Sequence, residues 1–391
     1  MSDREIAIVG VGMTKFGKYA ETPLKTLADR AVTLALNDAG LEIVDIEMAF
    51  VANAMASIVT GEVSAVGQGV LRASGFSGIP VFNVDNACAG SSSALNLAIN
   101  AIRSGAAETV LVLGVEKLVS DDRSRAYIAL NGATDLDTLR ASGIDAANES
   151  VFVAAIYPER LSAYQAKYGL AAETLAKITV KNRRHAADNP LAQFDAPITV
   201  DEVLASRRIV GPLSALMCAP IGDGAAALIV CSRKRLSRSQ RPVWVLGSAV
   251  GMGAPPGAES SIRRVTARAY RQAAIGPDDI DIAEVHDSIA FNELLAYEEL
   301  GFCEPGRGAR LVEGGVTSIG GRRPVNTSGG LESRGHPVAA TGAAQIVELS
   351  IQLRGEANKR QVSDARYALA ENAGGFAIDD TAAIAVTILG V

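Results

Sequence analysis

Cysteine is scarce in this chain of 391 residues, and its four copies lie far apart. Cys88, Cys218, Cys231 and Cys303 show no paired CxxC spacing, so we expect neither a metal site nor a disulfide framework. Unpaired thiols suit a reducing compartment, and we predict a cytoplasmic protein. Long apolar runs are also missing from the sequence. We therefore expect no membrane span, because such a helix needs roughly 20 apolar residues.

Positive charge is in deficit as well. The formal net charge is −6, which gives little support to a nucleic-acid partner. Basic residues nevertheless cluster in the runs DDRSR, KNRRH and SRR, and a few such side chains suffice to bind an anionic ligand. The length and the 48% share of hydrophobic residues allow two domains or one large duplicated core.

The chain repeats itself. When the sequence is shifted so that Ala35 falls on Ala269, the segments 35–51 and 269–285 agree at several apolar positions and at one aspartate. A second pair follows in the same order, with DGAAALIV starting at Asp223 and DDTAAIAV at Asp379. Two matches in one order predict a duplicated architecture.

Short apolar strands alternate with helical segments in each half. TVLVLGV (109–115) and AAALIVC (225–231) are continuously apolar, which is typical of strands buried on both faces of an α/β protein. Segment 120–209 belongs to neither repeat, and we predict an inserted loop domain there that caps the site, with a helix near 158–169. An ordinary surface excursion is the alternative. The predicted halves are then 1–119 with 210–238, and 239–391.

One cysteine and one histidine stand in corresponding loops of the two halves. Cys88 follows an apolar strand and precedes GSSS and an amphipathic helix; the helix N-terminus favours a thiolate there, although a small buried cysteine is the alternative. His336 lies in GGLESRGHPVAATG, the matching loop of the second half. Loops related by a pseudo-twofold axis meet, and a Cys–His pair is the usual way to activate a thiol.

The other candidates lie near predicted strand ends. His286, in EVHDSIAFNE, follows a predicted buried strand, where sites of α/β folds assemble, although a purely supporting histidine is the alternative. Gly374 and Gly375, in ENAGGFAID, are expected just after a strand, where their N–H groups either bind an oxyanion or form a simple turn. His185, in the charged run KNRRHAADN, is expected at the surface.

Over nearly its whole length the chain resembles the thiolase superfamily, and it is most similar to the sterol-carrier-protein-type and archaeal branch, which includes acetyl-CoA acetyltransferases. The blocks that carry the resemblance are NACAGSSSAL, PLSALMCAPIGDGAAAL, HDSIAFNE, PVNTSGGLESRGHPVAATG, LRGEANKRQV and NAGG. The resemblance implies an α/β thiolase fold: two duplicated βαβαβαββ halves in a five-layer αβαβα arrangement with an inserted loop domain. It also implies a homodimer or homotetramer, and a place in fatty acid and lipid metabolism.

The resemblance further implies the roles of the site residues. Cys88 carries the acyl group, His336 activates it, His286 helps to hold the thioester oxygen, and the N–H groups of Cys88 and Gly374 form a second oxyanion hole. Coenzyme A and acyl-CoA are substrates, and no cofactor is tightly bound. The phosphates of coenzyme A need cationic donors, for which the candidates are Arg123, Arg125, Arg183, Arg184, Arg207 and Arg208.

The chain departs from the family where thiolases carry a second catalytic cysteine, since Ser288 and Asn372 occupy the two positions. Carbon–carbon chemistry needs a base for the α-proton, and that base is unassigned. The leading interpretation is an acyl-CoA C-acyltransferase of the 3-ketoacyl-CoA thiolase kind, which passes the acyl group to CoA or to an acetyl-CoA carbanion. One alternative is a retro-aldol carbon–carbon lyase or acyltransferase that needs a small OB-fold and zinc-ribbon partner. Others are a ketoacyl synthase and a non-catalytic lipid-binding protein.

Overall fold

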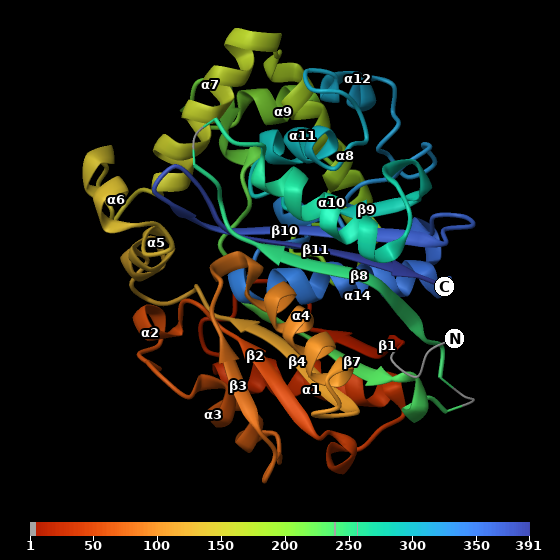
Figure 1. The fold of residues 1–391 in the computed structure, drawn as a ribbon. Helices are drawn as coiled ribbons and strands as arrows, with labels where there is room; N and C mark the ends of the chain where they lie inside the picture. Colours follow the sequence, from red (N-terminus) through yellow and green to blue (C-terminus); the bar gives the residue numbers. More distant parts are fainter. Residues whose placement is uncertain (1–4, 238–239, 256) are drawn as a thin grey trace.

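The computed structural model describes residues 5–237, 240–255 and 257–391. Five strands form the first half of the molecule, in the order β3-β2-β4-β7-β1 (Figure 1). The outer pairs β3–β2 and β2–β4 are parallel, whereas β7 runs antiparallel to β4 and β1. The strands are β1 (Ile6–Met13), β2 (Met48–Ala52), β3 (Val81–Val84), β4 (Thr109–Glu116) and β7 (Gly224–Ser232).

The second half repeats this order, which confirms the duplication. Strands run β9-β10-β11-β8; β9 and β10 are parallel, and β11 runs antiparallel to β10 and β8. A parallel bridge between Ala283 and Val325 stands where the first half has β3. The two sheets meet edge to edge, because Ala7 and Ile8 of β1 pair with Trp244 and Val243 of β8. The strands are β8 (Val243–Gly251), β9 (Ile282–Glu284), β10 (Tyr367–Ala377) and β11 (Asp380–Gly390).

Helices complete the predicted five layers. Helices α4 (Gly90–Arg103) and α14 (Thr341–Leu353) pack together between the two sheets, and their apolar side chains share one core with both (Figure 1). Helices α1 (Leu24–Ala39) and α3 (Val66–Ala73) cover the outer face of the first sheet. Helices α10 (Ser261–Ala273) and α11 (Ala290–Glu299) cover the outer face of the second. The α/β thiolase arrangement expected from the sequence is therefore present.

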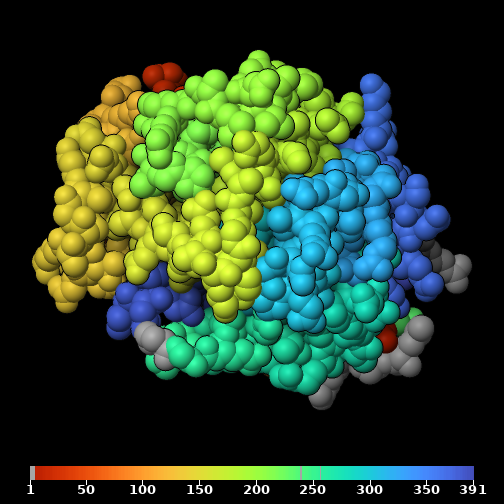
Figure 2. All heavy atoms as spheres, turned by 90° about the horizontal axis from the view of Figure 1, so that it is seen from above, coloured from red at the N-terminus to blue at the C-terminus, as the bar shows by residue number. Residues whose placement is uncertain are grey.

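The connection between β4 and β7 is long, whereas the corresponding strands β10 and β11 are joined by a tight hairpin. The connection between β4 and β7 forms much of the face seen in Figure 2, where it is coloured gold to green. The predicted helix near 158–169 is present as α7. The predicted boundaries of the insertion, 120–209, stay a prediction, and the boundary between 238 and 239 lies outside the described residues. The elements are α5 (Ser124–Asn131), α6 (Leu136–Ser142), α7 (Tyr157–Tyr168), α8 (Ala172–Ala187), α9 (Val200–Ala205), β5 (Arg208–Val210) and β6 (Leu213–Ser214).

His185 corrects one expectation, because it is buried rather than exposed. Its Nε2 accepts the N–H of Ile319 and its Nδ1 contacts the carbonyl of Asn326, each at 3.0 Å. Burial lowers its pKa to about 3. The charged run was interpreted as solvated surface, but helix α8 packs against the second half, so that Lys181 and Arg183 are buried with it.

The remaining short helices are α2 (Ala56–Val59), α12 (Gly308–Glu313) and α13 (Gly330–Arg334). Within the described residues, every helix is too short or too polar to cross a bilayer.

Candidate active site

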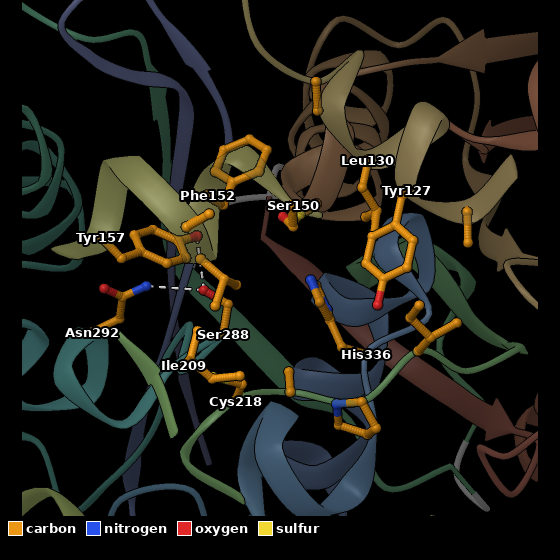
Figure 3. Close-up of a pocket in the computed structure, with 18 of the residues that line it drawn as sticks. Tyr127, Leu130, Ser150, Phe152, Tyr157, Ile209, Cys218, Ser288, Asn292 and His336 are labelled. Atoms are coloured by element: carbon orange, nitrogen blue, oxygen red, sulfur yellow. Dashed lines mark hydrogen bonds between the residues drawn. The ribbon is translucent and has the colours of Figure 1, made fainter. Parts of the chain in front are cut away.

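A cavity of about 1010 Å³ lies where the two halves and the insertion meet. Cys88 comes from the first half, His286, Ser288 and His336 from the second, and Tyr157 from the insertion. Figure 3 shows Tyr157, Ser288 and His336 around this cavity. This volume is at the upper end of the range for small-molecule sites. The structure therefore brings three of the four predicted catalytic side chains into one cavity, and the insertion lines it as expected.

The reactive atoms of Cys88, His286 and His336 are close together. One ligand-type atom from each residue, the sulfur or a ring nitrogen, lies within 4.8 Å of the other two. The two imidazole rings are nearly perpendicular, with centroids 5.3 Å apart. Proton transfer between the sulfur and either ring therefore needs only small movements.

Cys88 sits in a 3-10 turn, Ala87–Ala89, that leads directly into α4. The residue before it, Ala87, has a φ of 48°. Residues other than glycine rarely adopt this backbone conformation, and it recurs at functional sites. The helix N-terminus was expected to favour a thiolate, but burial outweighs it and raises the Cys88 pKa to about 12. The resting side chain is a neutral thiol, so its nucleophilic form needs a base.

His336 is held as a neutral imidazole. Burial lowers its pKa well below the usual value, and the neighbouring His286 and Arg334 lower it further. Its Nδ1 lies 2.7 Å from the hydroxyl of Thr341, which donates its own proton to the carbonyl of Pro337 at 3.2 Å. Nδ1 is therefore the protonated nitrogen, and Nε2 is free to accept a proton.

The loop before His336 is anchored by buried acids from the end of β9. Asp287 accepts the N–H of Leu331 at 2.7 Å, and Glu284 pairs with Arg334 at 3.2 Å. The pair His286–Asp287, called the HD motif below, thus has two parts: His286 lines the cavity, whereas Asp287 fixes the segment that carries His336.

His286 is oriented by Asn372, one of the two residues that replace the family's second cysteine. The Asn372 amide donates to the carbonyl of Cys88 at 3.0 Å, so its oxygen must be the atom 2.9 Å from His286 Nδ1. Because that oxygen can only accept, Nδ1 carries the proton and Nε2 carries none. Burial also lowers the His286 pKa to about 4. Neutral His286 is therefore a proton acceptor on its cavity side.

Gly374 and Gly375 lie within β10 rather than after it, because the hairpin with β11 continues beyond them. A Cβ on Gly374 would stand 2.2 Å from the carbonyl oxygen of Asn86, so only glycine allows this approach to the Cys88 loop. The N–H that reaches the Cys88 sulfur belongs to Gly375, and together with the Cys88 N–H it lowers the thiol pKa. Both glycines therefore lie beside the Cys88 loop, and the N–H that contacts the sulfur is that of Gly375 rather than that of Gly374.

The six candidate arginines separate into two groups. Arg123, Arg183 and Arg207 line the cavity, whereas Arg125, Arg184 and Arg208 are exposed elsewhere. Arg183 is buried, with its guanidinium carbon 4.3 Å from the centroid of the Phe194 ring.

Asn292 and Tyr157 are among the cavity residues that sequence reasoning missed. Asn292 could have been found, because it lies one helical turn after Ser288 and so shares its face. Tyr157 gave no signal, since it lies in the insertion and reaches the site only through the tertiary fold.

Comparisons with known proteins agree with this architecture. Residues 6–234 match the family model described as "Thiolase, N-terminal domain", and residues 253–387 match "Thiolase C-terminal domain-like". The acetyl-CoA acetyltransferase of Methanothermobacter thermautotrophicus is 36% identical over 95% of this chain and 97% of its own length. Human sterol carrier protein 2 is 37% identical over 95% of this chain and 70% of its own.

A solved structure described as the Ltp2-ChsH2(DUF35) aldolase superposes with a TM-score of 0.81 at 28% identity, covering 99% of this chain and 98% of that one. Two duplicated α/β halves that meet around a cysteine and two histidines define a thiolase-fold protein. The chain belongs to the thiolase family, as the matched domains and relatives show. The acetyl-CoA acetyltransferase among its relatives supports an enzymatic role.

Proposed function

We propose that the protein is an acyl-CoA C-acyltransferase of the 3-ketoacyl-CoA thiolase type, with Cys88 as the acyl carrier. The observation that carries this proposal is the grouping of a thiol and two proton-accepting imidazoles within 4.8 Å in one large cavity. Acyl-CoA and CoA are then substrates, and no resident cofactor takes part.

In the proposed reaction, Nε2 of His336 takes the proton of the Cys88 thiol, and the sulfur attacks the 3-keto carbon of the substrate. The C2–C3 bond breaks and the acyl group stays on sulfur. The proton passes from the His336 imidazolium to Nε2 of His286, whose ring centroid lies 5.3 Å from that of His336, and from there to the acetyl-CoA enolate. The thiol of a second CoA then attacks the acyl-enzyme, and its proton returns through imidazole to the Cys88 sulfur. We assign stabilisation of the oxyanion in each tetrahedral intermediate to the N–H groups of Cys88 and Gly375, which is supported by their contact with the Cys88 sulfur.

For the condensation direction we assign removal of the α-proton to His286. Its unprotonated Nε2 is an acceptor, set by the bond from Nδ1 to Asn372. A role in holding the thioester oxygen requires a proton on Nε2, which His286 acquires only after it has acted as the base.

Incubation with an acyl-CoA, followed by peptide mass spectrometry, tests the proposal. One acyl mass should appear on the peptide that contains Cys88, and Cys88→Ala should abolish it. Cys218→Ala is the matched control, because Cys218 lines the same cavity and burial raises its pKa to about 12 as well. Acylation at Cys218, or none on any cysteine, would overturn the assignment.

A second candidate is a thiolase-like acyltransferase or carbon–carbon lyase that needs a partner protein. It is favoured by the absence of the second cysteine at Ser288 and Asn372 and by the name of the similar structure, which describes a complex with a DUF35 protein. Assays of thiolysis and of retro-aldol cleavage, with and without a co-encoded OB-fold and zinc-ribbon protein, separate the two. Activity only in the partner's presence would favour this candidate. A homodimer or homotetramer and a cytoplasmic location stay predictions.

A further inference from the structure

Three polar residues stand together on one wall of the cavity, and none of them takes part in the proposed acyl transfer. Tyr157 comes from the start of α7, Ser288 follows the HD motif, and Asn292 lies in the first turn of α11. We call them the polar trio. Figure 3 shows them grouped on the side of the cavity opposite His336.

The hydrogen bonds of the polar trio run in one direction. The Asn292 amide donates to Ser288 Oγ, and the Ser288 hydroxyl donates to the Tyr157 oxygen, each at 2.9 Å. Tyr157 therefore accepts within the trio and keeps its own proton for another acceptor. Among the hydrogen bonds of the described residues there is none in which Tyr157 donates to a protein group. The phenol is thus an oriented O–H donor at the cavity wall.

Apolar side chains line the cavity together with this donor. Phe152, whose ring centroid lies 5.9 Å from that of Tyr157, lines the cavity with Ile209 and Leu295. Burial raises the pKa of Tyr157 to about 12, so the phenol keeps its proton, and the charge of a Cys88 thiolate raises that pKa further. The donor therefore lies within electrostatic reach of the sulfur that is proposed to carry the acyl group.

We propose that the acyl group that is transferred to Cys88 carries a hydroxyl or ketone oxygen further along its chain, beyond the carbonyl that becomes bonded to sulfur, and that Tyr157 donates a hydrogen bond to this oxygen. The proposal rests on acyl transfer at Cys88 and adds the substrate class. A purely hydrocarbon chain would cover the phenol O–H without pairing it. Sites built to bond a substrate oxygen discriminate against analogues that lack it for this reason.

The test compares three acyl-CoA probes: butyryl-CoA, 3-hydroxybutyryl-CoA and 4-hydroxybutyryl-CoA. The measured quantity is the ratio of kcat/KM for acylation of Cys88, oxygenated over plain. We expect a ratio of about tenfold or more for at least one hydroxylated probe, falling toward one in Tyr157→Phe. Tyr127→Phe is the matched control, because it removes another phenol oxygen from the same cavity and should leave the ratio as it is.

Two additions keep the proposal separate from the proposed function and from folding defects. Dissociation constants of the same probes, measured on Cys88→Ala, require no acylation and should show the same preference. Ser288→Ala removes the bond that orients the phenol and should reduce the ratio partly, with thermal unfolding checked for every variant. If the wild type prefers butyryl-CoA, or if Tyr157→Phe keeps the wild-type ratio in both assays, the proposal is overturned. Failure of acylation with the binding preference intact would instead count against the proposed function alone.

Discussion

The two halves of the molecule share one topology but carry different chemistry. In each half a 3-10 turn, Ala87–Ala89 or Val338–Ala340, leads into a central helix, and those helices pack on each other between the sheets. The first turn holds the thiol of Cys88, whereas the second follows His336. A duplicated fold therefore brings two loops face to face, and differences at a few positions place a thiol in one loop and an imidazole in the other.

The strands that end against these loops show the same relationship. Strand pairing aligns Met48 with Val110 in the first half and Ile282 with Ala368 in the second, so Gly114 and Asn372 occupy equivalent positions. Gly114 packs against the backbone of Ala339 and Ala340 in the histidine loop, and Asn372 bonds to Cys88 in the cysteine loop. Each half thus supports the reactive loop of the other.

Removing the base of the second half should have the largest effect. We expect His336→Ala to slow acylation of Cys88 by roughly 100- to 10,000-fold, the usual contribution of a positioned base, because the thiol, with its pKa of about 12, then loses the imidazole that is proposed to deprotonate it. Binding of CoA should change far less. Rapid-quench acylation and calorimetry measure the two. A variant that acylates at the wild-type rate would mean that His286 or another group deprotonates Cys88.

The contact from β4 to the histidine loop is tested by Gly114→Ala. The added Cβ would stand 2.5 Å from the carbonyl oxygen of Ala339 and 2.7 Å from Cα of Ala340, and neither backbone atom can rotate away. We expect a loss of about 1–3 kcal/mol in the free energy of unfolding, measured by denaturant titration. Gly69→Ala in α3 is the control, because its Cβ meets no atom within 4 Å. Equal stability of the two variants would show that the histidine loop is not held by this contact.

The equivalent contact from β10 is tested by Asn372→Leu. Leucine has a similar size but leaves the Cys88 carbonyl and His286 Nδ1 without their shared partner, so the imidazole is free to change tautomer. We expect carbon–carbon bond formation to slow by about tenfold, the effect of one lost hydrogen bond, and acylation to slow much less. Condensation and acylation rates on one preparation serve as each other's control. Equal slowing of both steps would assign Asn372 to general support of the site.

Much of this architecture could be predicted from the sequence. The repeat and the continuously apolar strands predict the duplicated sheets. The position of His336 in the matching loop predicts that it lies close to Cys88. These predictions succeed because buried strands appear in the sequence as continuous apolar runs, and pseudo-symmetry appears as repeated segments. The insertion has no counterpart in the other half of the sequence. For this reason the sequence does not reveal Tyr157, and the charged run around His185 resembles a solvated surface.

Charge states were harder to predict than positions. A helix N-terminus is visible in a sequence, and it favours a thiolate. The desolvation that opposes it depends on how tightly distant segments close over the sulfur, and here it prevails. The same limit applies to Asn372, whose role as the partner of His286 follows only from where its amide lies.

The smallest expected effect concerns pH, and it follows from what burial does to the two halves. Burial raises the pKa of Cys88 to about 12 and lowers the pKa of His336 well below its usual value. Both shifts favour the uncharged form, so the resting pair is a neutral thiol beside a neutral imidazole.

The imidazole acts as a base only when it is neutral, and because its pKa is lowered, that form persists as the pH falls through the range in which an ordinary histidine gains a proton. Activity is lost only when the pH falls through the lowered pKa. We therefore expect the rate of Cys88 acylation to change less than about twofold between pH 8 and pH 6. Rapid-quench measurements at constant ionic strength test this, with unfolding monitored at each pH. A decline centred near pH 6.5 would show that His336 titrates as an exposed histidine does. Burial would then not keep the imidazole neutral beside the neutral thiol of Cys88.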